Sequence, residues 1–477
     1  MYDCIVIGAG HNGLICASYL AQNGRKVLVL ENRHCVGGCC VTEELAPGYK
    51  ASTASYVVSL LLPEVIEELE LARHGYKTLA RCPSSFTPME DGRYLFLGPD
   101  HEENVSEIAK FSRRDAEAYP KYEAFLERVA ERIEPILNRK SPDLLPLPSS
   151  WRKKSIKKQV GDLRGGWTLH HAMKDLGDDL PEAIELMTGS AKTVLDRWFE
   201  SDELKGTLAT DAIIGAFQPY SAPGSAYVLL HHVMGSAGGA RGVWAYVEGG
   251  MGALADAIAS AARERGVEIR LDAPVERIEV AEGRVTGVRL EGGETFATRA
   301  VASSVDAHVT FEKMIAESEL PNNFLNAVRR IDFSSATLKI NLAVSELPDF
   351  TCLPGKNEVG PQHRGTIHIG ATTNYLERAY DDAKYGRPSE RPIVEMTDGS
   401  SGSTVEPTKE QNLPGQSPVL SDLPIVSKVI EDSASVESDA AVVEGTDRWE
   451  RVAPWAAGAY LIGLLLMGGR MACGFAG

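Results

Sequence analysis

Basic side chains are scarce in this sequence of 477 residues. Its 49 Lys and Arg residues are outnumbered by 66 Asp and Glu residues, which gives a formal net charge of −17. Because nucleic-acid binding requires clustered cations that neutralise phosphates, this balance argues against a nucleic-acid partner. The basic run RKKSIKK, from Arg152 to Lys158, is short. We interpret it as a solvated surface, with an anionic surface partner as the less favoured alternative.

Cysteine and targeting signals are also in short supply. Eight cysteines in a chain of this length do not form a disulfide scaffold. Neither a signal peptide nor an arginine-rich transit segment precedes the apolar run that starts at Tyr2, so a reducing compartment is expected. The His and Cys residues lack the spacing of metal ligands, and no metal site is predicted. What the sequence does contain is 43% hydrophobic residues, enough for a sizeable core.

The first thirty residues carry the pattern of a βαβ unit. Tyr2 to Gly8 is a continuous apolar run, as in a strand that is buried on both faces. Asn12 to Asn23 has helical periodicity, and Lys26 to Leu30 reads as a second buried strand. Such a unit belongs to a parallel sheet that is covered by helices, so an α/β, doubly wound domain is predicted.

The loop between this strand and helix has the form G-x-G-x-x-G. Gly8 permits a tight turn, Gly10 lets a pyrophosphate approach the backbone, and Gly13 packs helix on strand. An anion would then lie at the helix N-terminus, where free N–H groups point. Glu31 ends the second strand and is placed to bind a ribose diol. The alternative is a glycine-rich core turn with a surface glutamate. Nicotinamide and flavin dinucleotides both remain open at this point.

The residues that follow favour a flavin. The stretch ENRHCVGGCCVTEE places Arg33 two residues after the acid and the pair Gly37 and Gly38 soon after. This pattern resembles the second dinucleotide motif of flavin-dependent oxidoreductases. It implies that the two glycines let another backbone segment approach the cofactor, that Arg33 lies near its pyrophosphate, and that the cofactor is FAD.

Longer blocks extend the resemblance. YDCIVIGAGHNGLICASYLAQNG, RHCVGGCCVTEELAPGYKASTASYVVSLL, APGSAYVLLHHVMG and YVEGGMGALADAIA are similar to the phytoene desaturase-like FAD oxidoreductase family, from Met1 to about Thr397. The resemblance implies a fold like that of flavin amine oxidases. Its FAD-binding domain would comprise residues 1–81 and 247–306, and its mixed α+β substrate domain residues 82–246 and 307–397. In such folds Val275 is a candidate contact for the adenine end, although an ordinary strand residue explains it equally well.

Local patterns predict further elements. An antiparallel strand outside the parallel sheet is expected at Asp91 to Gly98, and long helices are expected at Tyr122 to Leu137 and Leu169 to Met187. Three strands joined by the turns AEG and EGG form a predicted β-meander at residues 275–280, 285–290 and 294–299.

No catalytic residue is assigned. His231 and His232 are neighbours on a predicted helix and point to different sides, and Glu248 is explained equally well as a helix-entry carboxylate. Cys39 and Cys40 are adjacent, and neighbouring cysteines pair only with strain. We therefore expect them to be packing residues without a redox role.

The sequence changes character after Thr397. Residues 398–451 are acidic and rich in Ser, Pro and Gly, and are predicted to be disordered. Residues 452–477 form an apolar tail. Its uncharged part, residues 452–469, just reaches transmembrane length, but one proline and several glycines disfavour that role. This region does not match the family pattern, which implies a weakly held FAD and little turnover.

The resulting hypothesis is an FAD-dependent oxidoreductase that removes hydride from an apolar or amine-like substrate. The alternative is a flavin-binding scaffold that acts through a protein partner, because the resemblance includes a proposed regulator of mitochondrial function. The resemblance also implies a mitochondrial matrix location in a eukaryote and a cytoplasmic one otherwise.

Overall fold

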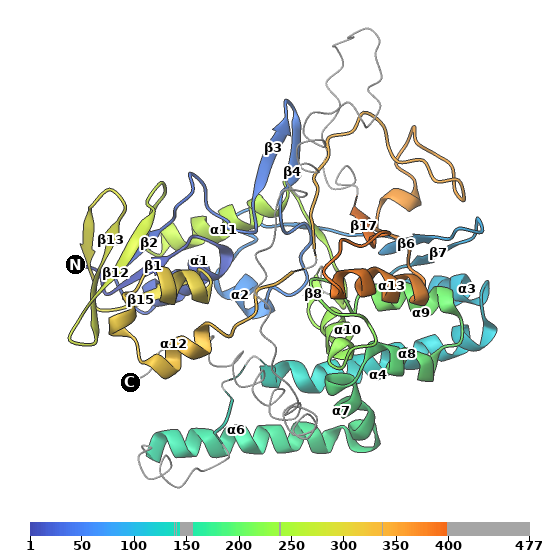
Figure 1. Cartoon of the computed structure of the whole chain (residues 1–477), viewed down its shortest axis with the longest axis horizontal. Coiled ribbons are helices and arrows are strands. Elements are labelled where there is room, and N and C mark those ends of the chain that lie inside the picture. Colours follow the sequence, from blue (N-terminus) through green and yellow to red (C-terminus); the bar gives the residue numbers. More distant parts are fainter. Residues whose placement is uncertain (138, 140, 144–155, 238–239, 336, 398–477) are drawn as a thin grey trace. The chain divides into compact units, whose positions relative to one another are not determined.

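The computed structural model describes residues 1–397 apart from 138, 140, 144–155, 238–239 and 336, and all of these belong to one compact unit (Figure 1). The disorder predicted for 398–451 and the apolar tail predicted at 452–477 lie outside the described residues. Within the described ranges, no helix is both long and apolar enough to cross a bilayer.

A four-stranded parallel sheet contains the N-terminus of the described chain. Its strands lie in the order β11 (Glu268–Arg270), β2 (Val27–Leu30), β1 (Cys4–Ile7) and β15 (Val301–Ser303). Every residue of β1 and β2 is buried. The prediction of a parallel sheet with strands buried on both faces is therefore confirmed for the start of the chain.

Successive side chains of β1 and β2 point to opposite faces of the sheet, and each face has its own cover. One face packs on α1 (His11–Gln22) and α11 (Met251–Glu264), through a cluster that includes Val6, Val29, Leu14 and Ile258. The other face packs on a meander through Ile5, Leu28, Leu30, Val288 and Leu290. Helices, sheet and meander thus form three layers.

The meander comprises β12 (Val275–Ala281), β13 (Arg284–Leu290) and β14 (Thr295–Ala297), joined antiparallel in that order. At the first turn Glu282 and Gly283 both have positive φ angles, 54° and 71°. Such a pair of angles matches the right-handed twist of the flanking strands. The predicted meander is confirmed, with a third strand shorter than expected.

A second four-stranded sheet has the order β17 (Val394–Thr397), β16 (Thr366–Ile369), β6 (Ser85–Pro88) and β7 (Tyr94–Leu97). The strand predicted within residues 91–98 is β7, which pairs antiparallel with β6 and lies outside the parallel sheet, as expected. The remaining strands form two-stranded pairs: β3 (Thr42–Ala46) with β4 (Tyr49–Ser52), β5 (Thr78–Leu79) with β10 (Tyr246–Val247), and β8 (Ser236–Ala237) with β9 (Ala240–Arg241).

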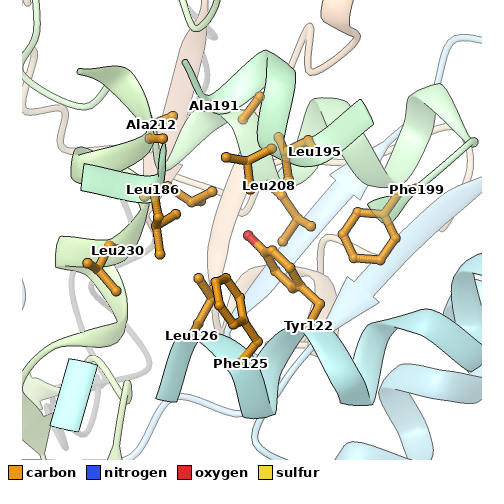
Figure 2. Close-up of a cluster of buried hydrophobic side chains, with 14 of the residues drawn as sticks. Tyr122, Phe125, Leu126, Leu186, Ala191, Leu195, Phe199, Leu208, Ala212 and Leu230 are labelled. Carbon is orange, nitrogen blue, oxygen red and sulfur yellow. The ribbon is translucent and has the colours of Figure 1, made fainter. Parts of the chain in front are cut away.

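Helices pack around a second, larger hydrophobic cluster. Figure 2 shows Tyr122, Phe125 and Leu126 on one helix facing Leu195, Phe199 and Leu208 on neighbouring segments. The helices of this region are α3 (His101–Ala109), α4 (Arg113–Leu137), α6 (Ile156–Asp175), α7 (Leu180–Thr188), α8 (Ala191–Trp198), α9 (Asp202–Thr210) and α10 (Ser225–Val233). α13 (Thr373–Lys384) also contributes to this cluster through Leu376, and two short helices lie elsewhere, α2 (Pro63–Glu68) and α12 (Asn322–Val328).

One predicted helix is wrong in its extent. The pattern from Leu169 to Met187 was expected to be continuous, but α6 ends at Asp175 and α7 begins at Leu180. Gly177 adopts a positive φ of 53°, and Pro181 lies at the start of α7. Glycine readily takes the left-handed conformation that ends a helix, and proline is favoured in a first turn. The domain boundaries at residues 81, 246 and 306 stay predictions.

Burial predicts how two leucines differ in their contribution to stability. Leu195 is fully buried in the helical cluster, whereas Leu338 is 73% exposed. We expect Leu195→Ala to lower the free energy of unfolding by about 2–5 kcal/mol, because it removes apolar contacts and leaves a cavity. Leu338→Ala should change it by about 0.5 kcal/mol or less. Chemical denaturation followed by circular dichroism measures both, and equal effects would contradict the packing described.

Candidate functional site

The loop between β1 and α1 depends on close backbone contact. Gly8 has a φ of 94°, and its N–H donates to the carbonyl of Leu30 at 2.8 Å. A Cβ atom on Gly13 would clash with the carbonyl oxygen of Gly8. The first glycine is thus needed for its conformation and the third for the approach of α1 to β1.

The second glycine faces the Gly37 and Gly38 pair. The Gly37 N–H donates to the carbonyl of Ala9 at 2.9 Å, and Gly10 and Gly37 form an isolated parallel bridge. A Cβ atom on Gly38 would lie 3.1 Å from the Cα atom of Gly10. The structure therefore brings both predicted glycine motifs together into one cradle, defined here as Gly8, Gly10, Gly13, Gly37 and Gly38.

Glu31 ties this cradle to the end of β2. Its side chain is 8% exposed, and its two carboxylate oxygens accept backbone N–H groups from Ala9 at 2.7 Å and from Arg33 at 2.9 Å. A carboxylate offers about four lone-pair sites, so each oxygen retains acceptor capacity for a hydroxyl group. Glu31 thus both fixes the loop and keeps the chemistry expected for a ribose contact.

Arg33 pairs with a carboxylate. Its guanidinium donates to Glu43 at 2.5 Å, and each of the two side chains is 37% exposed. The Thr53 hydroxyl donates to the same carboxylate at 2.7 Å. This hydrogen bond, followed by the charge of Arg33, lowers the pKa of Glu43. The pair attaches β3 to the segment after β2, near the cradle.

Val275 is the first residue of β12 and is half-buried opposite Leu290. The segment just before it runs beside Glu31: the Glu31 N–H donates to Arg270 at 2.9 Å, and the Ala273 N–H donates back to Glu31 at 2.8 Å. Val275 therefore lies two residues after Ala273, whose backbone is bonded directly to Glu31, the predicted ribose contact.

The cradle fits a pyrophosphate group. No side chain caps the N-terminus of α1, and its first turn contains no acidic residue. A Cβ atom on Gly10 would meet only backbone atoms at 3.9 Å, so no described side chain lies within 4 Å of that position. Uncapped N–H groups and the helix dipole favour an anion at such a terminus.

Sequence reasoning missed several residues that hold this region together. Ser304 follows β15, and its hydroxyl donates to the carbonyl oxygens of Ile7 and Gly8 at 3.2 Å. At the start of α11, the hydroxyls of Thr42 and Ser52 accept the N–H groups of Gly252 at 2.9 Å and Met251 at 3.0 Å. Serine and threonine are common helix-capping residues, but here they come from a hairpin about 200 residues earlier in the chain.

A polar cluster, defined as Tyr56, Arg81, Tyr246, His368 and Glu395, lies where the β5 and β10 pair meets the second sheet. The Arg81 guanidinium is over the Tyr246 ring at 5.3 Å and donates to the Thr366 hydroxyl. Tyr56 donates to Glu395. Burial lowers the pKa of His368 and so favours its neutral form.

Lys339 borders this cluster. Its ammonium group donates to the carbonyl oxygens of Ser52 at 2.9 Å and Ala54 at 2.5 Å, and it lies 4.7 Å from the centre of the Tyr56 ring. Burial lowers the pKa of Lys339. Shifted pKa values that cluster in this way are typical of functional sites. The lysine also attaches the segment around residue 340 to the end of the hairpin that caps α11.

Comparison with known proteins identifies the family of this chain. The family described as flavin containing amine oxidoreductase matches residues 13–400. The chain belongs to this family. Pyridine nucleotide-disulfide oxidoreductase domain-containing protein 2 of Rattus norvegicus is 45% identical over 419 residues, covering 85% of this chain and 71% of the rat protein. The resemblance found in the sequence is confirmed.

Other members and structures are less similar. A lycopene-forming phytoene desaturase of Pseudescherichia vulneris is 26% identical, with 72% of this chain and 64% of that protein covered. Among solved structures, cyclohexylamine oxidase from Brevibacterium oxydans is 20% identical, with 69% of this chain and 63% of that chain covered and a TM-score of 0.41.

The ionisable residues to which the sequence assigned no catalytic role, His231, His232 and Glu248, lie in structural surroundings. His232 stacks on Trp244 at 5.2 Å between ring centres, and its Nδ1 bonds to the carbonyl of Val228 at 3.1 Å. Burial, followed by the neighbouring His232, lowers the pKa of His231. Glu248 forms an ion pair with Lys77 at 3.1 Å. None of the three is brought to the cradle by these contacts.

All cysteines within the described part of the chain are free thiols. Cys39 is exposed and Cys40 is buried, as expected for neighbours that point apart. The Cys40 sulfur lies 3.5 Å from Nδ1 of His11, and burial raises the pKa of the thiol. No group of His, Cys, Asp and Glu among the described residues could hold a metal ion.

The contact between Gly13 and Gly8 can be tested with a matched pair of glycines in helices. Gly13→Ala forces α1 away from β1, so we expect it to lower the melting temperature and the flavin content together. Gly161, in α6, has nothing within 4 Å of an added Cβ atom. Gly161→Ala should leave stability unchanged or raise it by about 0.5–1 kcal/mol. Differential scanning fluorimetry distinguishes the two, and a Gly13→Ala protein as stable as the parent would contradict the close approach.

Proposed function

We propose that this chain is an FAD-dependent oxidoreductase that removes hydride from a C–H or C–N bond of an apolar or amine-like substrate. The observation that carries the proposal is the cradle: two glycine motifs converge on an uncapped helix N-terminus without an acidic residue in its first turn. Membership of the flavin containing amine oxidoreductase family supports it. The phytoene desaturase among the relatives supports an apolar substrate.

The residues in and beside the cradle would each contact a different part of FAD. Gly10, Gly37 and Gly38 leave room for the pyrophosphate, and the α1 N–H groups donate to it. Glu31 would accept hydrogen bonds from the adenosine ribose, and Val275 would contact the adenine end. Arg33 would add a positive charge near the pyrophosphate. Its ion pair with Glu43 would partly neutralise this charge. When bound, FAD supplies the hydride-accepting ring.

The protein must also position a substrate and exclude water from it. His368 of the polar cluster and Lys339 have lowered pKa values and lie between the hairpin at residue 52 and the second sheet. A neutral His368 and a lysine with a lowered pKa do not need a negatively charged group on the substrate to balance them. They are therefore compatible with an uncharged or amine-like substrate.

Gly10→Ala separates cofactor binding from folding. Gly10 has a φ of −66°, which alanine adopts freely, and an added Cβ atom meets only ordinary contacts at 3.9 Å. We therefore expect the flavin-free protein to keep its melting temperature. The dissociation constant for FAD should rise about tenfold or more, which corresponds to about 1.4 kcal/mol or more. Flavin fluorescence titration measures it. An unchanged affinity for FAD would show that the pyrophosphate does not lie at the position assigned here.

Turnover distinguishes an oxidoreductase from a flavin-binding scaffold. The full chain, loaded with FAD, should lose its absorption near 450 nm under anaerobic conditions when a suitable apolar or amine substrate is added, and should regain it with an electron acceptor. The panel would contain primary and secondary amines and unsaturated hydrocarbons. Tight FAD binding without reduction by any member of the panel would favour the scaffold, whereas absence of FAD binding would overturn both proposals.

A further inference from the structure

One face of the second four-stranded sheet is polar although it is buried. Thr366 and His368 are two residues apart on β16, so both side chains point to this face, and Glu395 of β17 is the register partner of His368. The two β16 side chains belong to residues that are only 8% and 6% exposed. The opposite face is apolar, with Phe86 and Ile367 fully buried. Buried polar groups need hydrogen-bond partners, so the polar face requires an explanation.

The guanidinium of Arg81 lies against this polar face. Arg81 is 5% exposed, and both of its hydrogen bonds come from Nη2, which donates to the carbonyl of Ser84 at 3.0 Å and to the hydroxyl of Thr366. Nε is enclosed without a partner, and the Tyr246 ring beneath the guanidinium carries no full charge. Within the described residues Arg81 forms no ion pair. A buried positive charge is thus left without a counter-ion.

His368 is equally uncommitted. Its ring forms no hydrogen bond, ion pair or ring contact with the described part of the chain. Burial lowers its pKa more than the charges of Glu395 and Asp211 raise it, so the ring is neutral and keeps one N–H donor. The ring nitrogens and Nη1 of Arg81 lack partners but, unlike Nε, are not enclosed by protein atoms. These donors therefore border space that a ligand can reach.

The nearby carboxylates do not neutralise Arg81. Glu395 accepts the Tyr56 hydroxyl, and neither it nor Asp211 forms an ion pair with the guanidinium. Glu395 is also exposed on β17, the edge strand of the sheet, where water and salt weaken its charge. The charge of Arg81 is therefore available to a ligand.

We propose that Arg81 and His368 bind a carboxylate group of the substrate. Nη1 of the guanidinium donates to the carboxylate, and the N–H of the neutral imidazole donates to it as well. The carboxylate supplies the counter-ion that the buried arginine lacks and fixes one end of the substrate. The inference rests on the proposed function, because it makes the apolar or amine-like substrate a carboxylate, either an apolar carboxylic acid or an amino acid.

Isothermal titration calorimetry of the full chain, with and without FAD, tests this site. Octanoate is compared with octylamine and octanol, and the free amino acid leucine with isopentylamine, which lacks the carboxylate. We expect one carboxylate to bind about tenfold or more tightly than the amine or alcohol with the same carbon chain. The series in which this difference occurs identifies the substrate as an apolar acid or an amino acid.

Two variants assign the binding to residues. His368→Leu removes no hydrogen bond to the described chain, so its circular dichroism spectrum should match that of the parent. The dissociation constant of the carboxylate should rise about tenfold, because one donor is lost. Arg81→Met should raise it further by removing the charge. If Arg81→Met does not fold, because Ser84 and Thr366 lose their donor, the His368 variant still decides the question.

Arg265→Met is the matched control. Arg265 also donates to backbone carbonyl groups, those of Ala261 at 3.0 Å and Glu68 at 2.8 Å, but it lies at the end of α11. This variant should bind the carboxylate as the parent does. A loss of binding equal to that of Arg81→Met would show an effect of positive charge in general and overturn the assignment.

Other outcomes would also overturn the site. These are equal affinities for acid, amine and alcohol, absence of carboxylate binding with and without FAD, and parental affinity in folded His368→Leu. If Arg81→Met weakened FAD binding while the parent bound no carboxylate, Arg81 would contact the flavin instead of the substrate. Carboxylate binding by a chain that does not bind FAD would contradict the proposed function alone, so the two failures are distinguishable.

Discussion

The backbone contacts made possible by glycine at the β1 to α1 turn are the constraint on which the parallel sheet and its helices depend. A side chain on Gly13 would push α1 away from Gly8, and one on Gly38 would press against Gly10. Without side chains, the end of β1, the start of α1 and the segment at residue 37 meet directly. The same absence leaves the N-terminus of α1 without a side-chain cap, so the residues that allow the packing also form the proposed anion site.

Glu31 extends this constraint over the length of the chain. Its carboxylate holds Ala9 and Arg33, while its backbone bonds to Arg270 and Ala273. Segments more than 200 residues apart in the sequence are thereby fixed around one residue. A side-chain substitution at Glu31 leaves the two backbone bonds but removes the carboxylate that holds Ala9 and Arg33, so it affects the loop directly, and loss of a ribose contact would be only part of its effect.

The parts of the fold that the sequence predicted are those with a local cause. The buried runs of β1 and β2, the glycine spacing and the turns of the meander each follow from neighbouring residues. The continuous helix at 169–187 was wrong because the periodicity of Leu and Met residues persists across Gly177, which takes a left-handed conformation. The regular spacing of apolar residues along a sequence does not show where one helix ends and the backbone turns.

The contacts that could not be predicted join distant segments through single side chains. Thr42 caps α11 at a separation of 210 residues, and Arg81 reaches Thr366 across 285 residues. Serine, threonine and arginine occur throughout the sequence, and nothing local distinguishes these from the others. Only the folded chain shows that Lys339, which lies in an irregular segment, is directed at the carbonyl groups of residues 52 and 54.

Local charge, and not the net charge of −17, decides which anions this protein can approach. At the cradle the attraction comes from backbone N–H groups and a helix dipole, both short-ranged and unaffected by distant carboxylates in salt.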